Sequence, residues 1–134
     1  MSLVRLLPAW LHAVADYAVG LSLIAVALLV HGSSAATGTG IVVGATVLLV
    51  SMLTRYPLGV VKVLPFTVHS AGDYLAAALL LAAPFALNFS ASDPALTFFY
   101  VFAGVAVVAV SLITNYQYSP KRQATSQPAW QYAG

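Results

Sequence analysis

The sequence predicts an all-α membrane protein, in which four transmembrane helices form two tandem helical hairpins of the same orientation. Hydrophobic residues make up 61% of the 134 residues and charged residues only 6%, against roughly 25% charged in ordinary soluble domains. Long apolar stretches occur four times, and the pattern of the first half recurs in the second. So few charges cannot cover a water-soluble surface, and we therefore exclude a soluble enzyme.

Four apolar stretches are the candidate spans, and each is read as a helix. They cover residues 10–30, 38–54, 69–89 and 95–114. Roughly 20 helical residues, each rising about 1.5 Å, cross a hydrocarbon core of about 30 Å. Three stretches reach this length, and 38–54 is near the lower limit. Lipid offers no hydrogen-bond partner to an open backbone, so uninterrupted apolar runs of this length must be helical.

The basic residues lie outside the spans and predict their orientation. They precede the first span, lie between the second and third, and follow the fourth. These residues are Arg5, Arg55, Lys62, Lys121 and Arg122. The loop 31–37 has no Lys or Arg, and the loop before the fourth span carries only Asp93. The positive-inside rule therefore places both termini and the central loop in the cytoplasm.

The net charge of the chain is only +2, which is too small to indicate a nucleic-acid-binding surface. We therefore expect no nucleic-acid partner.

An internal duplication organises the chain. Residues 6–17 recur 57 positions later, and a second set of residues recurs 60 positions later. The matched pairs are Leu7 and Leu64, Pro8 and Pro65, His12 and His69, Asp16 and Asp73, Tyr17 and Tyr74, then Gly44 and Gly104, Ser51 and Ser111, Thr54 and Thr114, and Tyr56 and Tyr116. We predict a first two-span hairpin over 1–59, a second over 60–118 and a polar cytoplasmic tail over 119–134. Two spans per half imply a pseudo-two-fold axis along the bilayer normal.

These repeated residues resemble a known family. Each half opens with Pro-x-x-x-His-x-x-x-Asp-Tyr, and a Ser-x-x-Thr-x-Tyr-x-x-Gly segment stands between the two copies at 51–59. Over about residues 4–118 this pattern resembles the SPW-repeat family of small bacterial integral membrane proteins. The name-giving Ser-Pro-Trp is degenerate here, with Ala-Pro-Phe at 83–85 and Val-Ala-Leu at 26–28. The resemblance implies the duplicated topology and a bacterial inner (plasma) membrane location, and it implies no activity.

Polar residues inside the first and third spans form the candidate site. An Asp at the centre of a span costs about 2.5–3.5 kcal/mol, so we expect these carboxylates to face the bundle interior. His at position i and Asp at i+4 share one helix face. The predicted polar cluster consists of His12, Asp16, Tyr17, His69, Asp73 and Tyr74. We predict no catalytic residue, because four short spans leave little room for a catalytic pocket of several hundred Å³.

Four hypotheses for the His and Asp residues stay open at this point. They could make structural contacts between helices, which are common in membranes and which we favour. His12 and His69 could instead bind a haem or a chlorin pigment, with Asp orienting each imidazole. Asp16 and Asp73 could carry protons or cations, or all four residues could hold a divalent metal. We accordingly expect a non-enzymatic protein of the bilayer, acting as an accessory or assembly subunit of a larger membrane complex or as a small homo-oligomer.

Overall fold

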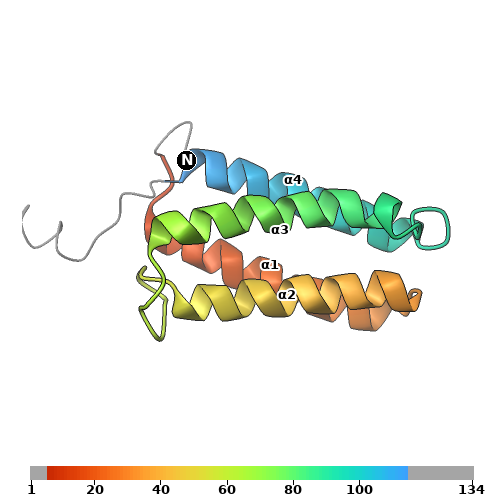
Figure 1. The fold of residues 1–134 in the computed structure, drawn as a ribbon, viewed down its shortest axis with the longest axis horizontal. Helices are drawn as coiled ribbons and strands as arrows, with labels where there is room; N and C mark the ends of the chain where they lie inside the picture. The colour runs from red at the N-terminus through yellow and green to blue at the C-terminus, as the bar shows by residue number, and fades with distance from the viewer. Residues whose placement is uncertain (1–5, 115–134) are drawn as a thin grey trace, which may run out of the picture.

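The structure, a computed structural model that describes residues 6–114, is a bundle of four α-helices (Figure 1). The helices are α1 Ala9–Val30, α2 Ser34–Leu53, α3 Phe66–Ala86 and α4 Pro94–Ile113. Each of the four is long and apolar enough to cross a membrane. The predicted fold class is therefore confirmed. The predicted tail, the basic residues Arg5, Lys121 and Arg122, and Tyr116 lie outside the described residues.

The structure moves the boundaries of two predicted spans. α2 begins four residues before the predicted start at 38, because the side chain of Ser33 accepts a hydrogen bond from the backbone N–H of Ala36 and caps the helix. The hydroxyl groups in its first turns find hydrogen-bond partners within the helix; the Thr39 hydroxyl, for example, donates to the carbonyl of Ala35. α2 is therefore a span of 20 residues rather than a short one. α3 is displaced towards the N-terminus relative to 69–89, since it starts directly after Pro65 and the chain turns at Asn88.

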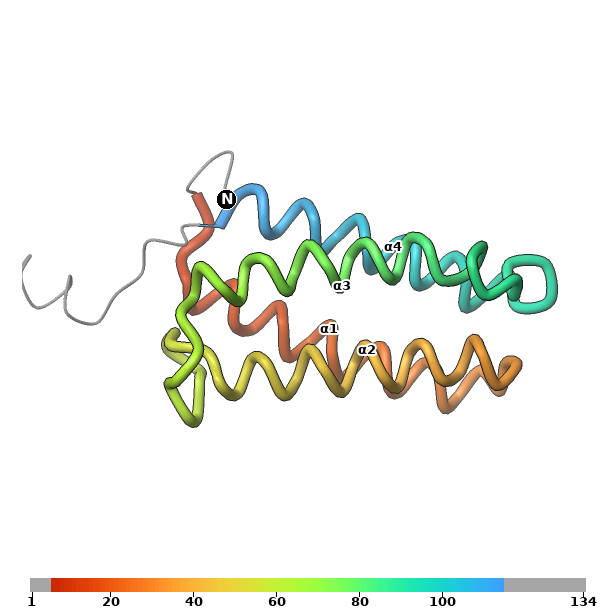
Figure 2. Tube along the Cα trace, viewed as in Figure 1, coloured from red at the N-terminus to blue at the C-terminus, as the bar shows by residue number. Residues whose placement is uncertain are grey.

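The two hairpin turns have matched backbone conformations. His31 ends α1 with φ of 52°, and Asn88, its counterpart in the repeat, follows α3 with φ of 60°. Both residues thus adopt the left-handed region that reverses the chain after a helix. Both turns lie at one end of the bundle, and the connection between α2 and α3 lies at the other end (Figure 2).

At that other end the two halves are joined in equivalent ways. The backbone N–H of Leu7 donates to the carbonyl of Ile113 at 2.8 Å, and the N–H of Leu64 donates to the carbonyl of Leu53 at 2.8 Å. Single β-bridges accompany both contacts, pairing Leu7 with Thr114 and Leu64 with Thr54. Thus α1 begins beside the end of α4, and α3 begins beside the end of α2. This arrangement brings the first turns of α1 and α3 together.

Small residues allow the helices of each hairpin to pack closely. A Cβ atom on Gly44 would lie 2.7 Å from the carbonyl oxygen of Gly20 on α1, and a Cβ on Gly104 would lie 3.1 Å from that of Ala77 on α3. The matched glycines therefore occupy the contact inside their own hairpins. The larger part of the core lies towards the hairpin turns, around Leu23, Leu80, Phe89, Leu96 and Tyr100.

Candidate functional site

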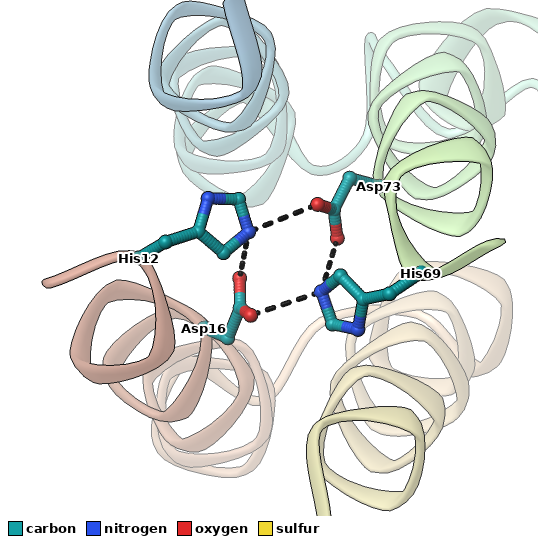
Figure 3. A group of neighbouring side chains, drawn as sticks. All are labelled: His12, Asp16, His69 and Asp73. Atoms are coloured by element: carbon teal, nitrogen blue, oxygen red, sulfur yellow. Dashed lines mark hydrogen bonds and ion pairs between the residues drawn. The ribbon is translucent and has the colours of Figure 1, made fainter. Parts of the chain in front are cut away.

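The site is built from the first two turns of α1 and α3. Pro8 and Pro65 are the residues that precede these helices, and both have extended backbone angles. The helices therefore start at equivalent positions in the two halves, three residues before each histidine. His12 and His69 are each 1% exposed. The side chains of Asp16 and Asp73 follow one turn later and point at the two imidazoles (Figure 3).

These four side chains contact one another in a closed arrangement, here called the His–Asp cluster. The Nε2 atom of His12 lies 3.3 Å from Asp16 Oδ1 and 3.0 Å from Asp73 Oδ2. The Nε2 atom of His69 lies 3.0 Å from Asp16 Oδ2 and 3.0 Å from Asp73 Oδ1. Each imidazole therefore touches both carboxylates, and each carboxylate gives one oxygen to each imidazole. The cluster links the two hairpins across the bundle axis.

Two threonines fix the orientation of the imidazoles. The Thr54 hydroxyl donates to the carbonyl of Val50 at 2.6 Å, so its oxygen accepts from the Nδ1–H of His69 at 2.7 Å. The Thr114 hydroxyl does the same for His12, at 2.6 Å to the carbonyl of Val110 and 2.7 Å to Nδ1. A hydroxyl has a single proton to give, so the proton of each Nδ1–Thr bond belongs to the imidazole. Both Nε2 atoms are consequently the ones that face the carboxylates.

The Nε2 atom of His69 differs from that of His12. The Nε2 atom of His12 makes a directed hydrogen bond to Asp73, whereas that of His69 is buried and, among the described residues, makes none. It is nevertheless 3.0 Å from an oxygen of each carboxylate. Its ring therefore points between the two carboxylates rather than at either one.

Aromatic residues close the cluster at the end of the bundle. Phe66 packs edge-on against His12, with ring centroids 5.4 Å apart, and against His69 at 5.9 Å. The Tyr56 hydroxyl, which is buried, donates to Asp16 Oδ2 at 3.1 Å. Burial and the nearby Asp16 charge raise the pKa of Tyr56, so it stays a hydrogen-bond donor. Tyr56 belongs to the α2–α3 connection, so these contacts pack that connection against the cluster.

Of the six residues predicted for the polar cluster, the structure brings His12, Asp16, His69 and Asp73 together. The Tyr17 hydroxyl donates to the carbonyl of Leu58 at 2.9 Å and so fastens the α2–α3 connection to α1. Tyr74 is half-buried on α3. The sequence reasoning assigned no role at the site to Tyr56, Phe66, Thr54 or Thr114. The repeat did carry a signal for the threonines, because both halves have a Thr at the matched position.

Two hollows reach the cluster. A cavity of about 30 Å³ between α1 and α4 touches His12 and Asp16. A groove of about 250 Å³ between α2 and α3 touches His69 and Asp73 and is otherwise lined mainly by apolar side chains. The site can therefore join helices, hold a small cation or exchange a proton. A porphyrin between His12 and His69 would have to displace both carboxylates, which occupy the space between the Nε2 atoms.

Comparison with known proteins supplies no relative that could assign a role to this site. No family model matches the sequence, and searches of curated proteins and of solved structures find no similar protein.

Proposed function

We propose that the protein is a non-enzymatic subunit of the bacterial plasma membrane, in which the His–Asp cluster locks two hairpins into one rigid unit. That unit serves as an accessory or assembly subunit of a larger membrane complex, or forms a small homo-oligomer. Both termini and the α2–α3 connection face the cytoplasm. The observation that carries the proposal is the cross-hairpin contact of each imidazole with the carboxylates of both hairpins.

A structural lock at this position has a physical reason. Apolar helices gain little from leaving lipid for one another, so packing and polar contacts decide how they associate. Within each hairpin, close glycine contacts serve this purpose. Between the hairpins, the polar groups of the cluster satisfy one another in a buried place, where unpaired groups would be costly. Separating the hairpins would break all the cross-hairpin contacts at once.

The outer surface of α4 supports a role in contact with another membrane protein. Phe98 and Phe102 are 74% and 62% exposed, and their rings stack with centroids 6.5 Å apart. Such a stacked aromatic pair on a span offers a partner helix a large and rigid packing surface. The four ionisable groups of the cluster are turned inward, so this surface carries none of them.

The test is the mass of the protein taken from its own membrane. A tagged chain extracted directly into lipid nanodiscs is analysed by native mass spectrometry. We expect a defined assembly with a larger membrane protein or with further copies of the chain, weakened by Phe98→Ala. The matched control is Phe85→Ala, which removes a ring that is 63% exposed on α3 and has no stacking partner among the described residues. A lone monomer in every preparation would contradict the proposal.

The other hypotheses predict different results from the same preparation. A haem or pigment held by His12 and His69 would give a Soret or chlorin absorption band that is lost in His12→Ala. Conduction through Asp16 and Asp73 would give proteoliposome flux that is abolished by Asp73→Asn. Membership of the SPW-repeat family also stays a prediction from the sequence.

A further inference from the structure

We propose that the His–Asp cluster is a binding site for one divalent transition-metal ion of the Zn²⁺ and Co²⁺ class, held by His12, Asp16, His69 and Asp73. This inference goes beyond the proposed function, because a structural lock needs no metal. It follows from the donor set, the spacing of the donors, the threonine contacts, the position of His69 Nε2 between the two carboxylates and the charge of the site.

The donors and their spacing fit a four-coordinate site. Two imidazole nitrogens and two carboxylates are ligands that Zn²⁺ accepts, at about 2.0–2.2 Å from the metal. A tetrahedron of such bonds places its ligand atoms about 3.4 Å apart. If Asp16 Oδ2 and Asp73 Oδ2 are taken as ligands, each lies 3.0 Å from the Nε2 atom of the histidine in the other hairpin. One ligand atom from each residue can be chosen so that all four lie within 4.8 Å of one another.

The threonines provide the outer contacts that a metal-binding histidine needs. A histidine that binds a metal through one nitrogen usually donates the other N–H to an acceptor, which fixes its tautomer and orientation. Here the Nδ1–H groups of His12 and His69 donate to Thr114 and Thr54. Both threonine oxygens are held in turn by a bond to their own helix. The Nε2 lone pairs are thereby aimed at the centre of the cluster.

The Nε2 atom of His69 is placed where it could bind an ion held between the two carboxylates. It belongs to a side chain that is 1% exposed, and among the described residues it makes no directed hydrogen bond. It lies 3.0 Å from one oxygen of Asp16 and 3.0 Å from one oxygen of Asp73, so it faces the space between the two carboxylates. An ion between the two carboxylates would lie where this nitrogen is directed.

The charge of the cluster selects a divalent ion. Two ionised carboxylates and two neutral imidazoles carry a charge of −2, which one divalent ion balances to zero. A neutral site suits its depth, because uncompensated charge inside a membrane protein is expensive. Binding replaces the protons shared by the Nε2 atoms and the carboxylates, and these protons leave to solvent. Two imidazole nitrogens favour Zn²⁺ and Co²⁺ over Mg²⁺ and Ca²⁺, which prefer oxygen ligands and larger coordination numbers.

The carboxylates of the cluster are not fully enclosed by the protein. Asp16 and Asp73 are 8% and 7% exposed, so the carboxylates are not fully sealed. The groove between α2 and α3 reaches Asp73, and the small cavity between α1 and α4 reaches Asp16.

The experiment titrates Co²⁺ into the purified, chelator-treated protein in nanodiscs. Visible absorption reports the coordination of cobalt, and metal analysis after gel filtration reports the stoichiometry. We expect one ion per chain, the intense visible bands of four-coordinate cobalt, displacement by Zn²⁺ and no displacement by equimolar Mg²⁺. Asp73→Asn is expected to weaken binding at least tenfold.

The chain supplies matched controls, because it has three histidines and three acidic residues in all. The third of each kind lies at the hairpin turns, since His31 follows α1 and Asp93 precedes α4, away from the first turns of α1 and α3 that hold the cluster. His31→Gln and Asp93→Asn should bind Co²⁺ like the unchanged chain. If Asp73→Asn fails to fold, a rise of the unfolding temperature of the unchanged chain with Co²⁺, absent with Mg²⁺, tests the site instead.

Two results would overturn the inference. One is the absence of a stoichiometric cobalt spectrum from the folded, unchanged chain. The other is loss of binding in His31→Gln or Asp93→Asn, since that would place the metal elsewhere. Neither result bears on the assembly measured by native mass spectrometry, so the metal site and the proposed function can fail separately.

Discussion

Replacing Thr54 by Val tests how the imidazoles are held. Valine keeps the branched shape of threonine but lacks the hydroxyl that accepts from His69 Nδ1–H at 2.7 Å. Thr54 is fully buried and His69 is 1% exposed, so the freed N–H is not open to bulk water. A buried donor left without an acceptor costs about 1–3 kcal/mol. We therefore expect Thr54→Val to lower the free energy of unfolding by about 2 kcal/mol, or roughly 30-fold in the folding equilibrium.

Thr46→Val is the matched control for that substitution. The Thr46 hydroxyl donates to the carbonyl of Val42 at 2.7 Å, as the Thr54 hydroxyl does to that of Val50, but Thr46 is exposed and does not contact the cluster. Its replacement is expected to change stability by less than about 0.5 kcal/mol. Unfolding by SDS in mixed micelles, followed by the loss of protease resistance, measures both variants. Equal stabilities of the two variants would refute the assignment of the His69 proton to Nδ1.

Further predictions concern packing and the far end of the bundle. Gly40→Ala is expected to destabilise the protein by about 1–3 kcal/mol, because its Cβ would lie 2.6 Å from that of Ala27, whereas Gly38→Ala meets nothing within 4 Å and should cost nothing. Thermal unfolding in detergent compares the two variants, and equal midpoints would contradict the close contact. The Ser33 N–H donates to Asp93 Oδ1 at 2.9 Å and holds the pKa of Asp93 below its ordinary value of 3.8. The stabilisation from the ionised Asp93 is thus complete above pH 3.8 and is lost as the pH falls further. The difference in stability between the unchanged chain and Asp93→Asn should therefore shrink below that pH. A stability difference that does not vary with pH would contradict this prediction.

Much of the fold could be predicted because membrane spans leave a strong pattern in a sequence. Long apolar runs predict helices since lipid permits little else. The start of α2 was missed because its first residues are polar, and their self-satisfying hydrogen bonds become visible only once the helix exists. The orientation of the bundle in the membrane stays a prediction, since the arrangement of the helices alone does not distinguish its two sides.

The candidate site could be predicted only in part. The i, i+4 spacing predicts that His12 meets Asp16 and His69 meets Asp73, and both contacts are present. The spacing carries no information about the contacts between hairpins, which depend on the distance between α1 and α3. The contact of Thr54 with His69 could not be predicted for a similar reason: Thr54 ends α2, whereas His69 lies on α3.

The equivalent backbone joints, Leu7 to Ile113 and Leu64 to Leu53, have a consequence for the origin of this architecture. In both joints, a residue just before the first helix of one half bonds to the end of the second helix of the other half. Only one of these two joints lies next to the covalent link after α2, so that link does not determine how the halves pack. Two separate copies of a single hairpin could assemble in the same manner, with every contact occurring twice. A tandem fusion of such copies frees each half to diverge, and the differing turn lengths at the opposite end are a difference of this kind.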